Sequence, residues 1–335
     1  MKIASYIAGL AGLLVLTALV LHHGLGEVMH LLGEASWALL WLVPFHALPL
    51  LLDAQGWRVL LAPRDPGGRA RLPFLFWVAT VREAVNRLLP TANVGGEIVG
   101  IRLVKWRLED GSAITASIII EVLLTLVNQY IFTALGIVLL VAHTQATEQT
   151  WTLVAGLALS LPLPIVFGAL LRYGKLFERM EQFAEKLLGS RSGLASLIDG
   201  ESLDSEIRGL YARHARLLGA LLWQLAGYVL GSFETWLALY LLGHPVTVWA
   251  AIAVEATTQA VRHIIFIVPA GVGVQEAGLV LFGQIIGIDS NVALSLSLAK
   301  RMREVLFGVP ALLSWQALEA RRLRRALREG DSGAA

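Results

Sequence analysis

Two short segments with one spacing interrupt the apolar stretches of this chain. Each begins with a proline, Pro90 or Pro269, contains two glycines, and reaches a glutamate seven residues after the proline. An aspartate follows thirteen residues beyond each glutamate, Asp110 in the first copy and Asp289 in the second. Proline and glycine break helices, and lipid cannot satisfy the backbone groups that a broken helix leaves unpaired. Such segments must be buried in protein or line a wet cavity, and two of them indicate a transporter binding site.

The composition is that of a polytopic membrane protein. Of the 335 residues, 56% are hydrophobic and 16% are charged, whereas soluble domains carry about 25% charge. The chain has no cysteine, which excludes disulfides, iron–sulfur clusters and thiol catalysis. Its eight histidines show no metal-binding spacing, and the sequence contains no ATP-binding motif. We therefore expect neither a metal nor a cofactor.

Six apolar runs are long enough to cross a bilayer, which takes about 20 helical residues. They lie at 3–21, 37–58, 111–142, 150–171, 217–242 and 290–316. The first run follows Lys2 and has the general form of a signal peptide. Because no small-residue cleavage site follows Leu21, we interpret it as a retained span.

The distribution of basic residues predicts how these spans are oriented. The loop after the first span has no Lys or Arg, whereas 172–216 has eight and the tail 317–335 is rich in arginine. We therefore expect the loop after the first span outside the cell, and 172–216, the tail and both termini in the cytoplasm. To satisfy this orientation, each motif-bearing segment must form a re-entrant hairpin that turns near its proline. The hairpin 72–110 is entered from the cytoplasm, and 247–289 from the outside.

The predicted fold is an all-α integral membrane protein with about six full spans plus two opposed re-entrant hairpins. Residues 1–142 form the first repeat and 143–316 the second, with the same series of elements in opposite orientation. The basic cytoplasmic tail 317–335 follows. Residue identity between the halves is low, so a chance match of spacing is the alternative to an inverted repeat.

Several charged residues lie at a depth where charge is costly. Glu121 lies about ten residues into the run 111–142 by rise per residue, and Lys300 has the corresponding position in 290–316. A charge at the bilayer centre costs about 2.5–3.5 kcal/mol on insertion scales, so such residues must face a cavity or pair with each other. With the two motifs they define the predicted substrate-binding set, which comprises Asn93, Gly95, Gly96, Glu97, Arg102, Glu121, Gly271, Gly273, Glu276, Lys300, Arg301, Arg303 and Glu304, with Pro90 and Pro269 at the hairpin tips.

Other residues have weaker claims or alternative roles. Polar side chains precede each tip, and further ones lie inside the spans: Arg82, Glu83, Asn86, Arg87, Arg262, His263, Asp53, Gln55, Glu234 and Glu255. The glycines also suit close helix packing, which is the alternative to a role in binding. Arg102 and the basic residues after it also suit a role in setting the topology.

The predicted cavity favours an anion. Helices that begin at Gly95–Gly96 and at Gly273 would point free N–H groups and a positive dipole end into it. We expect Lys300, Arg301 and Arg303 to hold an anionic or hydroxylated head group. The carboxylates Glu97, Glu121, Glu276 and Glu304 would neutralise these cations in the empty state or carry a coupling proton. The pattern does not identify the anion.

Three stretches resemble one known family. The stretch from Leu89-Pro90 through Gly95-Gly96-Glu97 to Arg102 is similar to the Pro…Gly-Gly-Asp…Arg element of the lysylphosphatidylglycerol synthase transmembrane-domain (flippase-like) family. The stretch 269–276 resembles its Pro-Gly-Gly-x-Gly-x-x-Glu element, and 297–316 resembles the hopanoid-biosynthesis-associated branch. The chain departs from the pattern in Glu97, where the family usually has Asp, and in Ala270, where it usually has Gly.

The resemblance implies an inner-membrane protein that moves or handles lipids, such as a hopanoid or its precursor. We interpret the chain as a lipid translocase and not as an enzyme, because no nucleophile or metal motif is present and no aminoacyl-transferase domain follows. An accessory subunit or membrane-embedded enzyme of hopanoid or lipid biosynthesis is the main alternative. A scaffold that docks other proteins through 172–216 is the third. The expected partners are membrane lipids and, as an option, other lipid-biosynthesis proteins, but no nucleic acid.

Overall fold

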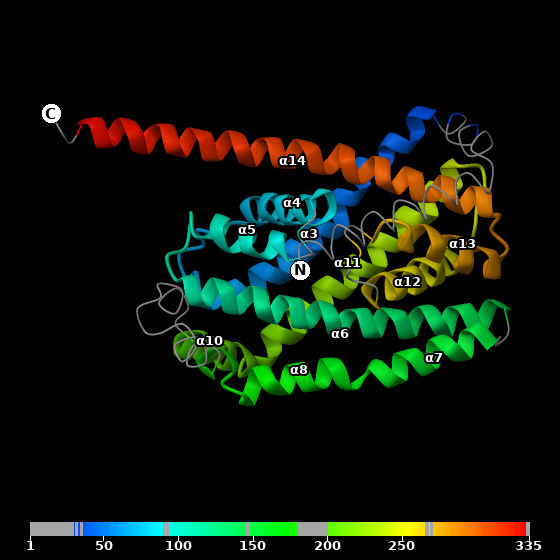
Figure 1. Cartoon of the computed structure of the whole chain (residues 1–335), viewed down its shortest axis with the longest axis horizontal. Helices are drawn as coiled ribbons and strands as arrows, with labels where there is room; N and C mark the ends of the chain where they lie inside the picture. The colour runs from blue at the N-terminus through cyan, green and yellow to red at the C-terminus, as the bar shows by residue number, and fades with distance from the viewer. Residues whose placement is uncertain are drawn as a thin grey trace.

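The described part of the chain is helical and contains no β-strand. The computed structural model describes residues 30, 33, 36–89, 91, 94–144, 148–179, 200–264, 268 and 271–332. Its helices, labelled in Figure 1, are η1 (Ser36–Trp41), α3 (Leu42–Leu61), η2 (Ala62–Arg64), α4 (Leu72–Leu88), α5 (Gly95–Val104), α6 (Gly111–Thr144), α7 (Glu148–Ser160), α8 (Pro162–Tyr173), α10 (Gly200–Tyr211), α11 (His214–Leu241), α12 (Val248–Ile264), α13 (Val274–Ile286) and α14 (Ser290–Ser332). The predicted run 3–21 and the tips Pro90 and Pro269 lie outside the described residues.

Four helices in the described residues are long and apolar enough to cross a membrane. They are Trp37–Arg64, Gly111–Ala142, Val154–Tyr173 and His214–Leu241, and each coincides with a run predicted from the sequence. The protein is therefore an all-helical, multi-pass membrane protein. The predicted run 290–316 forms part of α14, but this helix carries four charged side chains between Lys300 and Glu304 and is not among these four spans.

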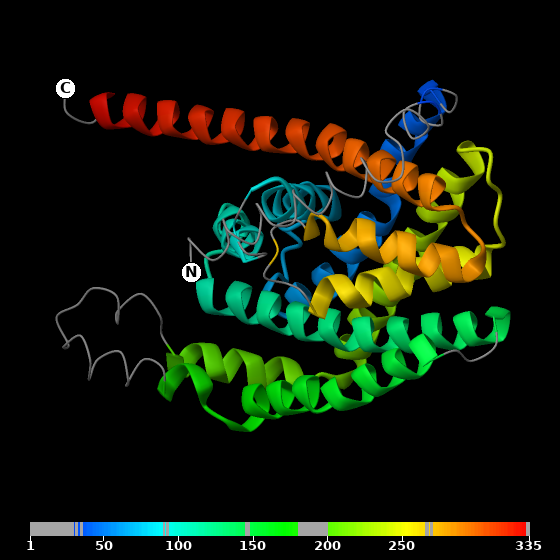
Figure 2. The same ribbon diagram turned by 45° about the vertical axis from the view of Figure 1, so that its right-hand side comes forward.

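The helices form a bundle with α14 along one side and the α7–α8 pair along the other (Figures 1 and 2). Between them, α3 packs along α11 and α6 packs along α12, while α4 lies against both α5 and α14. The helix α13 packs between α12 and α14. This arrangement surrounds the centre of the bundle with helices from both halves of the chain.

Two helix triplets follow the same order. Helices α4 and α12 each have 17 residues, and a short helix follows each one, α5 with 10 residues and α13 with 13. A long helix completes each triplet, α6 with 34 residues and α14 with 43. Both short helices begin at the glycine motifs. The division of the chain into two repeats stays a prediction.

The two motif aspartates cap the long helices of these triplets. The backbone N–H of Ala113 donates to Asp110 Oδ1 at 2.9 Å, and that of Asn291 donates to Asp289 Oδ1 at 2.8 Å. A side-chain oxygen directly before a helix satisfies one of the N–H groups that have no partner within the first turn. The aspartate that ends each motif spacing thus has a structural role, which is to cap the helix that follows.

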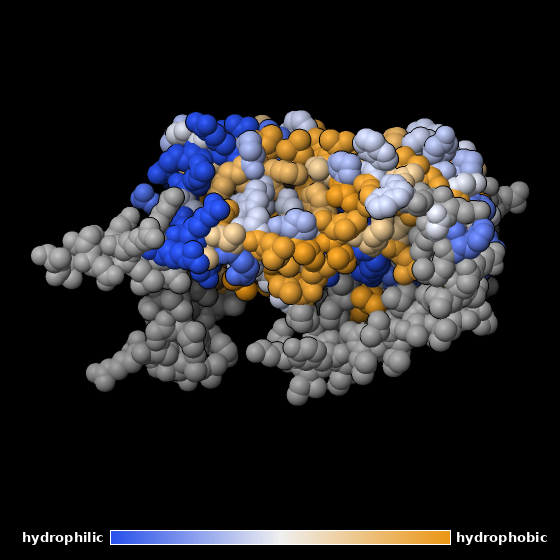
Figure 3. Space-filling view, turned by 90° about the horizontal axis from the view of Figure 1, so that it is seen from above, coloured by the Kyte–Doolittle hydropathy of each residue, from blue (hydrophilic) through white to orange (hydrophobic). Residues whose placement is uncertain are grey.

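Apolar side chains cover much of the outer surface. Figure 3 shows them across the middle of one face, with hydrophilic residues gathered towards its ends. On α7 and α8, large hydrophobic residues such as Leu159, Leu163 and Ile165 expose more than half of their surface. An extended apolar surface of this kind suits contact with lipid tails.

The crossing of α6 and α12 provides a test of the fold. A Cβ added at the buried Gly136 would lie 2.5 Å from Ala256 Cβ, whereas one added at the exposed Gly156 would meet no atom within 4 Å. We expect Gly136→Ala to separate these helices at a cost of about 1–3 kcal/mol and to lower the Tm measured in detergent. Gly156→Ala should leave the Tm unchanged or slightly raised. Equal Tm values for the two variants would contradict this packing.

Candidate functional site: a cavity lined by ion pairs

A central cavity of about 510 Å³ lies where α3, α4, α5, α6, α11, α12, α13 and α14 meet. Its lining includes seven carboxylates and five Lys or Arg side chains. They are Asp53, Glu83, Glu97, Glu121, Glu234, Glu255, Glu304, Arg82, Arg87, Arg262, Lys300 and Arg303. In a low-dielectric setting most of these charges need partners, and the ion pairs therefore describe the site.

Arg82 on α4 forms the centre of the first cluster. Arg82 is 8% exposed. Its guanidinium donates to Glu121 Oε2 from α6 at 2.9 Å and also pairs with Glu97 from α5. It lies over the ring of Trp57, with 4.7 Å from Cζ to the ring centroid. One cation thus pairs with two carboxylates, and its contacts link four helices.

Glycine is required where α5 passes this cluster. A Cβ at Gly100 would lie 2.6 Å from Arg82 Cδ, and one at Gly96 would lie 2.7 Å from Asn86 Nδ2. The Gly96 N–H donates to Asn86 Oδ1 at 2.8 Å. The small residues therefore bring the backbone of α5 against α4, which is the packing role that the sequence left as an alternative.

Glu276 forms the centre of the second cluster. Its side chain is fully buried, and it accepts from the Gly273 N–H at 2.6 Å, from Ser297 Oγ at 2.9 Å and from Arg301 Nε at 3.1 Å. Gly273 has φ +79°, a conformation that L side chains rarely adopt. Arg301 also donates to Glu304 at 3.0 Å. Glu276 therefore both caps α13 and pairs with α14.

Two more ion pairs anchor α14. Lys300 pairs with Glu255 of α12, which also accepts from Thr235 Oγ1 at 2.5 Å. Arg303 Nε donates to Glu234 of α11 at 2.9 Å. These pairs connect the charged turn of α14 to the two helices on the opposite side of the cavity.

His46 of α3 bridges two of the acids. Its Nδ1 lies 2.9 Å from Glu234 Oε2, and its Nε2 lies 2.9 Å from Glu83 Oε2. Arg303 Nη1 lies 3.2 Å from the same Nε2. His46 thereby joins helices α3, α4, α11 and α14 at one point.

The structure brings together most of the predicted site residues. Glu97, Glu121, Gly271, Lys300, Arg303 and Glu304 line the central cavity, and the Glu276–Arg301 pair lies beside it. Gly95 packs at the start of α5, where an added Cβ would lie 2.5 Å from Thr91 Cβ. Arg102 is not brought to the cavity, because it pairs with Glu319 at 2.8 Å and exposes 67% of its side chain. Asn93, like both tip prolines, lies outside the described residues.

The partners of the basic residues differ from those expected. Glu97 and Glu121 neutralise Arg82 and not the cations of α14. Lys300 and Arg303 pair instead with Glu255 and Glu234, which the sequence ranked as weaker candidates. The reason is packing: α11 and α12, rather than α5 and α6, supply the carboxylates that face this turn of α14. Among the described ion pairs of this turn, those of Arg301 are the ones with partners from the expected set, Glu276 and Glu304.

Sequence reasoning missed residues that α3 and α11 contribute. His46, Gln224 and Tyr228 line the central cavity but were not among the candidates. His46 lies within the apolar run 37–58, and a polar ring in a membrane span is costly unless it has a partner. The position of His46 in an apolar run was therefore the sequence signal for a buried polar contact. Among the described residues, no group of three or more His, Asp or Glu side chains could hold a metal ion.

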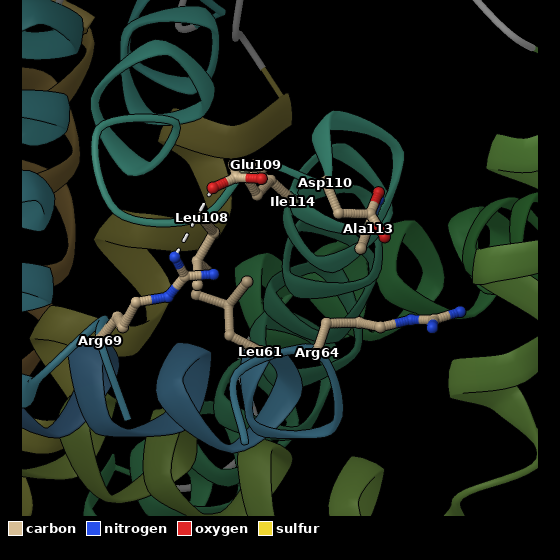
Figure 4. A pocket seen from close by; sticks show the side chains of 8 residues that line it. All are labelled: Leu61, Arg64, Arg69, Leu108, Glu109, Asp110, Ala113 and Ile114. Carbon is tan, nitrogen blue, oxygen red and sulfur yellow. Dashed lines mark hydrogen bonds and ion pairs between the residues drawn. The ribbon is translucent and has the colours of Figure 1, made fainter. Parts of the chain in front are cut away.

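A second cavity, of about 170 Å³, lies where α3 ends and α6 begins (Figure 4). Arg69 reaches across it to Glu109, with 3.7 Å between Nη1 and Oε1. Arg64 turns away from it and pairs with Glu206 of α10. The side chains of Arg69 and Glu109 are largely exposed. This cavity is a weaker candidate than the central one, because its charged rim faces outward.

Residues 6–311 match the family model for the lysylphosphatidylglycerol synthase TM region. The chain belongs to this family. The match includes every helix of the central cavity except the end of α14, so the ion pairs lie within the family domain. No curated protein and no solved structure matches the chain. Membership of the lysylphosphatidylglycerol synthase TM family supports a membrane protein involved in lipid handling.

Three substitutions test the Arg82 cluster, because we expect them to lower the free energy of unfolding by different amounts. Arg82→Gln leaves Glu97 and Glu121 without their cation, and breaking a buried ion pair in this way costs about 3–5 kcal/mol. Glu121→Gln should cost less than half as much, because Arg82 keeps Glu97. The matched control Arg102→Gln removes an exposed pair and should cost at most about 1 kcal/mol. Thermal unfolding in detergent measures all three, and an equal loss for Arg82→Gln and Arg102→Gln would contradict the burial of the cluster.

Proposed function

We propose that this membrane domain translocates a lipid and that the polar head group moves through the central cavity. The observation that carries the proposal is a cavity of about 510 Å³ lined by charged side chains within an apolar bundle. A volume in this range holds a small ligand. A polar head group could shelter there from lipid tails, while the acyl chains stay in the bilayer.

The short helices support the finer topology that this proposal uses. At about 1.5 Å per residue, α5 is about 15 Å long and α13 about 20 Å, both shorter than the hydrocarbon core of about 30 Å. Helices of this length suit the second arms of re-entrant hairpins. We therefore propose six spans plus two opposed hairpins, in the bacterial inner membrane, with both termini in the cytoplasm.

A hopanoid, or another polar or anionic lipid, is the proposed substrate. The support for a hopanoid is the resemblance of 297–316 to the hopanoid-associated branch. The alternative, an accessory subunit or membrane-embedded enzyme of lipid biosynthesis, would use the buried carboxylates as acid–base groups. Each carboxylate in the Arg82, Lys300 and Arg303 pairs is held by a cation, and this favours a binding role over proton transfer to a substrate.

Filling the cavity tests translocation. Gly231 of α11 lines the central cavity, and a Cβ added there would meet no atom within 4 Å. Gly231→Phe should therefore place an aromatic ring in the path, with free space for its Cβ. In proteoliposomes with a fluorescent phospholipid analogue, dithionite quenching should reveal transbilayer movement by the wild type. We expect Gly231→Phe to lower its rate at least about tenfold, the free-energy equivalent of about 1.4 kcal/mol.

The matched control is Gly156→Phe, which places the same ring on the exposed face of α7. This control should move lipid at the wild-type rate, and both variants should keep the wild-type Tm. A Gly231→Phe protein with the wild-type rate would show that lipid does not pass through the cavity. A wild type that moves no lipid but converts a lipid precursor in vitro would favour the enzyme alternative.

A further inference from the structure

The cations of the central cavity are not equally neutralised. Arg82, Lys300 and Arg303 each pair with at least one carboxylate within 4.0 Å and are less than a tenth exposed. Arg262, at the end of α12, lines the same cavity, but the described residues place no carboxylate within 4.0 Å of it. Among the described residues, no carboxylate therefore forms an ion pair with Arg262.

The partner of Arg262 is a neutral amide. Its Nη1 donates to Gln275 Oε1 at 2.7 Å, and Gln275 lies in the first turn of α13. The stem of Arg262 passes close to Gly271, where an added Cβ would lie 2.7 Å from Arg262 Cγ and where φ is +61°. The positive φ and the close approach both favour glycine. The second glycine motif thus holds this guanidinium at the cavity wall.

Gln275 adds a hydrogen-bond donor to the same wall. The residue is 4% exposed and lines the central cavity. Because its Oε1 accepts from Arg262, the orientation of the amide is set and Nε2 carries the two donor hydrogens. In the described part of the structure, this buried Nε2 has no hydrogen-bond partner. A buried donor without a partner is costly, and an acceptor bound in the cavity would satisfy it.

Arg87 adds positive charge near this position. Among the described residues, the acid within 4.0 Å of Arg87 is Glu83, which lies 3.9 Å from Nε, beyond hydrogen-bond distance. Glu83 already contacts His46 and Arg303. Arg87 and His263, the neighbour of Arg262, both line the central cavity. The ends of α4 and α12 therefore bring two weakly compensated arginines to one cavity.

From these contacts we infer an anion subsite formed by Arg262, Gln275 and Arg87, which takes a phosphate-type oxyanion. Its ligand should carry several acceptor oxygens, because a guanidinium and an amide N–H group can then donate to it at the same time. The source is either the phosphate of a lipid head group or free phosphate. The inference rests on the proposed function only for the lipid source. It differs from the expectation that Lys300, Arg301 and Arg303 hold the anion.

The test measures binding to the full-length protein in an uncharged maltoside detergent. The three probes are dioctanoyl phosphatidic acid, the neutral dioctanoylglycerol and inorganic phosphate. Each probe is titrated into the protein, and its binding is measured from the rise in Tm and by native mass spectrometry. We expect the wild type to bind the phosphatidic acid at least about tenfold more tightly than the diacylglycerol. Inorganic phosphate that binds as tightly as the phosphatidic acid would identify free phosphate as the ligand and would still support the subsite.

Two variants locate the binding. Arg262→Gln removes the guanidinium, and Gln275→Glu supplies an internal carboxylate that neutralises it without creating an unpaired charge. Each should weaken binding of the phosphatidic acid at least about tenfold, and Gln275→Glu should keep the wild-type Tm. The control Arg216→Gln alters an exposed arginine that hydrogen-bonds to the backbone of Val59, outside the cavity, and should bind as the wild type does.

Wild-type affinity in Gln275→Glu would overturn the subsite, as would equal binding of the charged and neutral lipids. The flip assay is a separate measurement, so the two proposals can fail independently. Arg262-dependent binding without lipid movement by the wild type would support the subsite and contradict translocation. If Gln275→Glu moves lipid and binds phosphatidic acid as the wild type does, translocation would be supported and the subsite contradicted.

Discussion

The pairing of buried charge is the constraint on which this structure depends. In a bundle surrounded by lipid, a buried guanidinium or carboxylate without an opposite charge carries a desolvation cost of several kcal/mol. The partners come from distant helices: Arg82 on α4 meets Glu121 on α6, and Arg303 on α14 meets Glu234 on α11. Buried pairs add little net stability. Their effect here is to set which helix faces meet, and thereby to keep a polar cavity inside an apolar bundle.

Local sequence patterns predicted the parts of the fold that depend on local physics. Hydropathy located four spans that the structure contains, because a run of apolar residues fits lipid wherever the helix lies. The motif spacing likewise corresponds to two helix starts capped by Asp110 and Asp289. The partners of the charges depend on the rotation of each helix about its axis, which no local pattern contains. Arg102 and Glu255 were misjudged for this reason: the first faces Glu319 at the surface, and the second faces Lys300 inside.

Two arginines that pack against glycines differ in their electrostatic surroundings. Gly100 admits the side chain of Arg82, and Gly271 admits that of Arg262, each at a distance that a Cβ would prevent. Arg82 then meets two carboxylates, whereas Arg262 meets the amide of Gln275. One arginine therefore lies between carboxylates, whereas the other has no carboxylate within 4.0 Å among the described residues. The glycines explain how the arginines fit, and the side chains opposite them decide what each arginine can bind.

This difference decides where an anion can enter at the lowest cost. Binding at Lys300 or Arg303 requires separation from Glu255 or Glu234, which leaves a buried carboxylate without its cation at a cost of about 3–5 kcal/mol. Binding at Arg262 breaks no ion pair among the described residues and gives the Gln275 amide an acceptor. A charge-assisted hydrogen bond contributes about 1.5–3 kcal/mol, which is too little to offset the rupture of a buried pair. An anion in this cavity is therefore expected beside Arg262, with the ion pairs of α14 kept intact.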